Sequence, residues 1–187
     1  MKENCKSQTG SCLSAHSGTM LIDDFTGMGL APRLGLQWRG VSDRVMGGIS
    51  EASIFHSVID GCSCMRLTGD VRLENNGGFI QAALDLAHTG KTFDASGYKG
   101  LRIIVRGNGE KYSVHLRTPD NIRPWQSYRA HFTSRSDWEI INLDFNAFAP
   151  HRLEVPLDTK RLRRIGLVAI GRAFKADLAI SELAFYH

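Results

Sequence analysis

The segment from Trp38 to Gly48 contains the most varied set of chemically useful side chains in the sequence. It reads W-R-G-V-S-D-R-V-M-G-G and combines an indole ring, a hydroxyl, a carboxylate and a guanidinium within eleven residues. Such a mixture suits recognition of a polar ligand, but it equally suits a loop held by its own hydrogen bonds to Asp43 and Arg44. The sequence leaves both interpretations open. The candidate binding residues of this segment are Trp38, Ser42, Asp43 and Arg44.

A second aromatic segment, P-W-Q-S-Y-R, spans residues 124–129. Trp125 and Tyr128 are candidates for stacking on a sugar or on a protein surface, although aromatic residues of a β-sandwich more often belong to its core. Gln81 and Arg117 would add the hydrogen bonds that a sugar requires. These four residues are the basis of a carbohydrate-binding interpretation.

Basic side chains recur on one face of several expected strands. In the runs 101–106, 112–118 and 127–132, apolar residues alternate with residues that are mostly Arg or His. If these strands are neighbours, one sheet face carries Arg102, Arg106, His115, Arg117, Arg129 and His131. Like charges at cross-strand distance destabilise a sheet. Either carboxylates from loops pair with these groups, or the face receives an anionic partner.

Catalytic and metal-binding motifs are absent from the sequence. It contains no G-x-S-x-G, HEXXH, C-x-x-C or EF-hand pattern, and the glycines at 107 and 109 precede a strand rather than a helix. They predict a hairpin turn and not a dinucleotide site. We therefore expect no catalytic residues, no metal ligands and no cofactor. Asp23, Asp24 and Asp177 leave a structural calcium ion open.

Composition narrows the class of protein. The chain has 187 residues and a formal net charge of +4, a mildly basic balance that does not by itself indicate nucleic acid. The basic run from Lys160 to Lys175 lacks the interleaved aromatic residues typical of single-strand binding. No apolar run is long enough to cross a membrane. We expect no nucleic-acid partner and no transmembrane segment.

The N-terminus and the cysteines bear on the compartment. Residues 1–19 lack the apolar core of a secretory signal and the arginines of a mitochondrial presequence, so they predict a flexible tail. Cys62 and Cys64 lie two apart in an expected strand, where a bond between them is awkward. Reduced thiols and a cytoplasmic location are the expectation.

Strand signals dominate the rest of the chain. Runs of alternating or β-rich residues, separated by Gly, Pro, Asn and Asp turns, predict about ten strands: 20–25, 52–59, 64–73, 78–86, 101–106, 112–118, 127–132, 139–145, 165–170 and 178–186. The best helical candidate is 158–164, with Asp158 or Thr159 as cap. This pattern predicts one all-β domain over residues 20–187, either a sandwich or a barrel.

These runs also resemble a known family. The segment W-R-G-V-S-D-R-V-M-G-G-I-S at 38–50 is similar to the signature of the complex I intermediate-associated protein 30 family. The blocks 69–81, 94–109, 112–118, 125–128, 145–152, 163–172 and 180–186 follow in order. The resemblance implies a galactose-binding-like jelly-roll β-sandwich related to carbohydrate-binding modules. It further implies kinship with mitochondrial assembly factors of respiratory complex I (NADH:ubiquinone oxidoreductase), for which no catalytic residues are established.

The sequence thus predicts a non-catalytic, chaperone-like binding domain. Its partner would be a protein, with complex I assembly intermediates as the class that the resemblance suggests. Docking would use the basic sheet face and the loop 38–48. A carbohydrate-binding module is the alternative. The missing presequence favours a bacterial relative over a mitochondrial protein.

Overall fold

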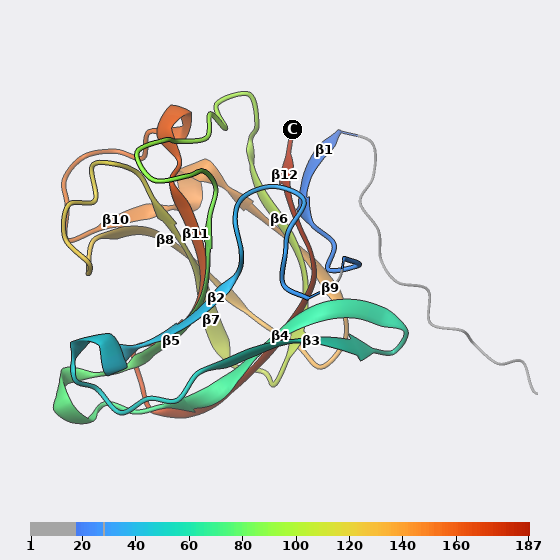
Figure 1. The fold of residues 1–187 in the computed structure, drawn as a ribbon, viewed down its shortest axis with the longest axis vertical. Coiled ribbons are helices and arrows are strands. Elements are labelled where there is room, and N and C mark those ends of the chain that lie inside the picture. The colour runs from blue at the N-terminus through green and yellow to red at the C-terminus, as the bar shows by residue number, and fades with distance from the viewer. Residues whose placement is uncertain (1–17, 28) are drawn as a thin grey trace, which may run out of the picture.

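The computed structural model describes residues 18–27 and 29–187, which form a sandwich of two antiparallel sheets (Figure 1). The first sheet has the order β3 (Ser53–Ile59), β4 (Cys62–Val71), β12 (Phe174–Tyr186), β6 (Gly100–Gly107) and β9 (Glu139–Asp144), with β1 (Thr19–Asp23) also paired to β12. The second sheet has the order β10 (Ala149–His151), β8 (Ser127–Thr133), β7 (Lys111–Arg117), β11 (Arg164–Ile170), β5 (Phe79–Asp85) and β2 (Arg39–Ser42).

Short 3-10 helices connect some of the strands. They are η1 (Asp43–Met46), η2 (Glu74–Asn76), η3 (Phe145–Ala147) and η4 (Thr159–Arg161). The helical turn expected at 158–164 is confirmed as η4, where the Asp158 carboxylate caps the backbone N–H of Lys160 at 3.0 Å. No helix in the described ranges is both long and apolar enough to cross a membrane.

All ten predicted strand segments are strands, and the predicted jelly-roll sandwich is confirmed. The sequence missed β2 and β10. Each has only three or four residues, and Gly40 or Pro150 interrupts its alternation. Both lie at an edge of the second sheet, where a short strand and a proline are tolerated because one side needs no partner.

A single apolar core lies between the two sheets. One row across the second sheet illustrates it, because Leu84, Ile165, Leu116 and Tyr128 are direct cross-strand neighbours and each is 0% exposed. Burying a side chain of this size contributes about 1.5–3 kcal/mol. These residues fix the register, and the alternating residues of the same strands therefore point to the outer face.

The cysteines only partly follow the expectation. Cys64 is a free and fully buried thiol, and burial raises its pKa. Cys62 is disulfide-bonded, so the expectation of reduced thiols is wrong for that residue. Residues 1–17 of the expected tail, with the remaining two cysteines, lie outside the described residues. The cytoplasmic location stays a prediction.

Candidate functional site

The six basic residues expected on one face lie on two different sheets, so that expectation is wrong. Arg102 and Arg106 belong to β6 in the first sheet, whereas His115 and Arg117 of β7 lie in the second. Arg129 and His131 of β8 lie beside them. The expected hairpin at 107–109 does not form, because the chain crosses from one sheet to the other there. The Asn108 side chain anchors this crossing by donating to the Lys175 carbonyl and accepting from the Tyr112 hydroxyl.

The two arginines of β6 already have partners within the molecule. Arg106 forms an ion pair with Asp60 and lies over the Trp138 ring, 5.8 Å from its centroid. Arg102 is 9% exposed and lies 4.0 Å from the Glu182 carboxylate. Carboxylates of the protein therefore neutralise this part of the predicted site, and a partner would gain little there.

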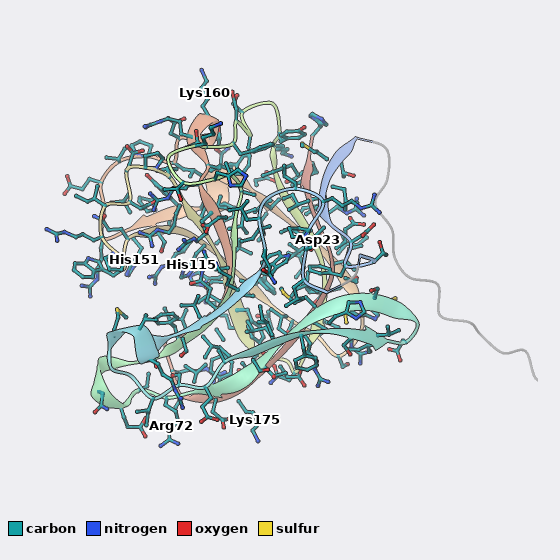
Figure 2. The ribbon with its side chains drawn as sticks, in the orientation of Figure 1. Asp23, Arg72, His115, His151, Lys160 and Lys175 are labelled. Carbon is teal, nitrogen blue, oxygen red and sulfur yellow. The ribbon has the colours of Figure 1, made fainter. Side chains whose placement is uncertain are left out.

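The other basic residues gather on the outer face of the second sheet. Cross-strand pairing places His115 beside Arg129 and His131 beside Ser113, while Ser127 lies beside His151 of β10. Figure 2 shows His115 and His151 on the same side of the molecule. We call this surface the basic face, which comprises His115, Arg117, Arg129, His131, His151 and Arg152.

A census of arginines separates the basic face from the rest of the described residues. The chain has 16 arginines, and eleven of them lie within 4.0 Å of a carboxylate oxygen. The five without such a partner lie on the basic face or on the adjoining loops, and they are Arg117, Arg123, Arg129, Arg152 and Arg163. The face therefore carries uncompensated positive charge.

Burial and the nearby cations lower the pKa values of several residues on the basic face. Burial, with Arg164 and Arg163 nearby, lowers the pKa of Arg117 to about 10. Burial and Arg152 lower the pKa of Arg129. Burial and the neighbouring cations also lower the pKa of all three histidines, that of His115 to about 3, so the imidazoles are neutral at pH 7. An anion on this face would relieve the repulsion.

Arg117 organises a loop rather than presenting its charge. Its guanidinium donates to the carbonyls of Asn121 (3.2 Å), Arg123 (2.8 Å) and Pro124 (3.3 Å), which closes the β7–β8 connection. That loop leaves Trp125 49% exposed. The expected partner of Trp125 in stacking, Tyr128, is fully buried, with its hydroxyl on the Pro156 carbonyl at 3.2 Å. Of these two rings, Trp125 is the one exposed to a ligand.

The loop 38–48 is held by hydrogen bonds between Asp43 and neighbouring segments of the chain. Asp43 is 0% exposed and accepts from the Ser50 N–H (2.9 Å), the Ser50 hydroxyl, and the N–H groups of Gly78 (2.5 Å) and Phe79 (3.3 Å). Burial would raise the pKa of Asp43, but these hydrogen bonds outweigh it and lower the pKa. A Cβ on Gly48 would overlap the Asp43 carboxylate. The structural interpretation of the motif therefore accounts for Asp43.

The other predicted residues of this loop divide between core and surface. Trp38 is 2% exposed and donates from Nε1 to Asp23 at 2.8 Å. Ser42 caps η1, accepting from the Arg44 N–H at 3.4 Å, and Arg44 pairs with Glu51 at 3.0 Å. Trp38 therefore offers no aromatic platform to a ligand.

Gln81 lies on the outer face of β5, the strand next to the edge strand β2 of the second sheet. A Cβ on Gly166 of β11 would overlap the Gln81 side-chain amide, so that amide lies over the glycine. Gly166 is the direct neighbour of both Ala83 and His115. Gln81 is thus a polar group beside the basic face.

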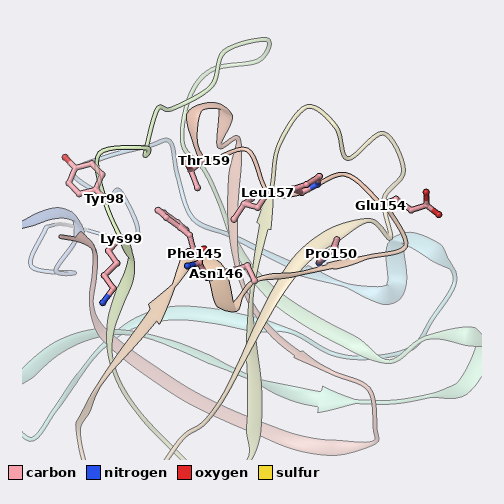
Figure 3. Close-up of a pocket in the computed structure, with 10 residues that line it drawn as sticks. Tyr98, Lys99, Phe145, Asn146, Pro150, Glu154, Leu157 and Thr159 are labelled. Carbon is pink, nitrogen blue, oxygen red and sulfur yellow. The ribbon is translucent and has the colours of Figure 1, made fainter.

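A groove of about 700 Å³ opens at another place, where the chain passes from β9 to β10 (Figure 3). None of the predicted site residues lines it. Its walls are Tyr98, Lys99, Phe145, Asn146, Phe148, Pro150, Glu154, Pro156, Leu157 and Thr159. Sequence patterns could not reveal it, because its residues come from three connections and from Pro150 of the short strand β10 rather than from one alternating strand.

Metal ligands do not gather in the described part of the chain, where no three His, Cys, Asp or Glu side chains are grouped so as to hold an ion. The carboxylates weighed for calcium have other partners. Asp23 accepts from Trp38, Asp24 pairs with Arg33 at 2.6 Å, and Asp177 pairs with Arg66 at 2.5 Å.

Comparison with known proteins agrees with the fold. The family described as Complex I intermediate-associated protein 30 (CIA30) matches residues 31–180. No curated protein sequence matches the chain significantly. A family 11 carbohydrate-binding module from Clostridium thermocellum, solved with a β-1,3-1,4-mixed-linked tetrasaccharide, has a TM-score of 0.67 at 14% identity, covering 92% of this chain and 97% of that one. A family 30 module of a C. thermocellum cellulosomal cellulase has a TM-score of 0.62 at 15% identity, covering 88% and 95%.

Proposed function

Because the chain belongs to the complex I intermediate-associated protein 30 family, we propose that it is a non-catalytic binding domain that docks a protein partner through the basic face. The partner class is an assembly intermediate of NADH:ubiquinone oxidoreductase. The single observation that carries this proposal is the gathering of the carboxylate-free arginines on one side of the second sheet. An acidic surface on the partner would complement that charge and speed association.

Within the basic face, we assign different roles to the predicted residues. Arg129 is the contact residue, since Ser127 is its one hydrogen-bond partner among residues 18–27 and 29–187, at 2.9 Å. Trp125 adds an exposed aromatic surface of the kind that anchors interfaces. Arg117 supports both by holding the loop in place.

The test is affinity purification of the tagged chain from its native source, followed by mass spectrometry. We expect subunits of the oxidoreductase to co-purify with the wild type and to be lost from a variant carrying Arg129→Glu and Arg152→Glu. The matched control carries Arg33→Glu and Arg135→Glu, whose side chains are 61% and 81% exposed and lie outside the basic face. Equal capture by both double variants would contradict the proposal, because the result would then depend on the net charge of the protein and not on the basic face.

A carbohydrate-binding function is the second candidate, favoured by the exposed Trp125 and by the Gln81 amide on the outer face. One of the similar modules is solved in complex with a tetrasaccharide and the other belongs to a cellulosomal cellulase, but at 14–15% identity the likeness shows the fold alone. Burial of Tyr128 counts against it, since a sugar site needs more than one exposed ring or an equivalent platform. Titration with a mixed-linked β-glucan tetrasaccharide, read by tryptophan fluorescence against Trp125→Ala, tests it directly.

A further inference from the structure

The centre of the basic face is a row with small residues on either side of its two functional groups. Arg129 of β8 pairs with Ala149 on one side and with His115 on the other, and His115 pairs in turn with Gly166. The neighbour on the Arg129 side, Ala149, is exposed and carries only a methyl group, whereas the Gln81 amide lies over Gly166 on the His115 side. A ligand atom can therefore approach Arg129 from solvent on the Ala149 side, and His115 borders that approach with 8% of its surface exposed.

The polar groups in this row have unused hydrogen-bonding capacity. The Nε of Arg129 donates to Ser127, and its two terminal nitrogens have no partner among the described residues. His131 and His151 likewise form no hydrogen bond within the described chain, while the Nε2 of His115 lies 3.0 Å from the Ser113 hydroxyl. The free end of a guanidinium is a planar fork that fits the two oxygens of a carboxylate.

We propose that Arg129, together with His115 and His151, forms a subsite that binds one carboxylate of an acidic segment of the protein partner, and that binding takes up a proton from solvent. The inference rests on the proposed function, since it names the chemistry that the basic face recognises. A carboxylate is favoured over a phosphate because the site offers one fork with neutral imidazoles beside it, which suits a single negative charge.

Proton uptake follows from the groups that face the subsite. The outward residues of β7, β8 and β10 include no carboxylate, and the charged or titratable groups around Arg129 are Lys111, His115, Arg117, His131, His151 and Arg152. Beyond β7, the strand β11 adds Arg164, which pairs with Asp85 of β5 at 2.5 Å, and this carboxylate acts on Arg117. Without ligand, burial and then the neighbouring cations lower the pKa of the imidazoles, so they are neutral. A bound carboxylate offsets part of the positive charge around them, so it raises the pKa of His151 and His131. Linkage then requires tighter binding as the pH falls from about 7.5 towards about 6.

The experiment uses a fluorescein-labelled hexa-aspartate peptide as the probe and fluorescence anisotropy as the measurement, at pH 7.5 and pH 6.0. Aspartate keeps its charge over this range because its ordinary pKa is about 3.9. We expect the wild type to bind at least about threefold more tightly at pH 6.0, a change that corresponds to a fraction of one proton. Calorimetry in two buffers of different ionisation enthalpy counts the protons taken up.

Variants separate the roles of the residues. Arg129→Gln should weaken binding about tenfold or more at both pH values, because it removes the charged fork. His151→Gln should lose much of the gain in affinity that the wild type shows at pH 6.0 relative to pH 7.5. Arg129→Lys keeps the positive charge without the planar guanidinium, so it should lower the peptide affinity by an intermediate amount. This variant replaces Arg129→Gln in the experiment if Arg129→Gln does not fold. Arg135→Gln is the control for net charge.

Three results would overturn the inference. One is an equal effect of Arg129→Gln and Arg135→Gln, and another is affinity that does not change with pH. The third is competition by inorganic phosphate at a much lower concentration than by acetate at equal ionic strength, which would indicate a phosphate site. These outcomes are independent of co-purification: peptide binding with no captured oxidoreductase subunits would remove the proposed partner and leave the subsite.

Discussion

Lowering the pH should destabilise the protein through His115. This imidazole is 8% exposed, and its burial beside Arg129, His131 and His151 lowers its pKa from 6.5 to about 3. Between those two values the unfolded chain binds a proton that the folded chain does not bind. Stability is therefore lost as the pH falls through 6.5. The loss from this residue is about 2 kcal/mol at pH 5 relative to pH 7.

The assay is urea unfolding of the wild type and of His115→Gln at pH 7 and pH 5. Glutamine does not titrate and can still bond to Ser113, so the variant lacks this pH-dependent term. Because His131 and His151 are present in both proteins, their contributions cancel in the difference. We expect the wild type to lose about 2 kcal/mol more than the variant. Equal losses, within about 0.5 kcal/mol, would refute the buried neutral imidazole.

Three further predictions concern the remaining site residues. Gly48→Ala should destabilise the protein by about 2 kcal/mol or more, because a Cβ there overlaps Asp43, whereas Gly97→Ala meets nothing within 4 Å and should be nearly neutral in the same thermal unfolding experiment. Asp43→Ala should cost about 3 kcal/mol in chemical denaturation, since it leaves several buried N–H groups without an acceptor. Tyr128→Phe should cost about 1 kcal/mol by losing one hydrogen bond, while Trp125→Ala should leave stability almost unchanged and weaken partner capture.

The sequence predicted the strands well because alternation of apolar residues is a local property of each strand. The inward set Tyr112, Val114 and Leu116, for example, is fully or almost fully buried. Sheet membership is not local. The short connection at 107–109 is compatible both with a hairpin and with a crossing between sheets, and the contacts of Asn108 that decide it reach Lys175, 67 residues away.

The candidate site could be predicted only in part, because alternation identifies single outward residues but not which strands are neighbours. Arg117 and Arg129 were identified because they alternate with buried residues, but the flank formed by His151 and Arg152 was missed along with β10. The role of Trp38 could not be inferred either, since its partner Asp23 lies 15 residues earlier, on β1. Fifteen residues of separation leave no periodic signal that pairs an indole with a carboxylate.

The position of β12 has a consequence for biosynthesis. This strand of 13 residues pairs with β4, β6 and β1, so it lies at the centre of the first sheet although it follows all the other described strands along the chain. Until residues 174–186 have left the ribosome, β4 and β6 each lack a hydrogen-bonded neighbour, and their apolar faces have no completed layer to cover them. A nascent chain of this topology must remain soluble with an open sheet, which makes slow, late closure and dependence on cellular chaperones the expected course of its folding.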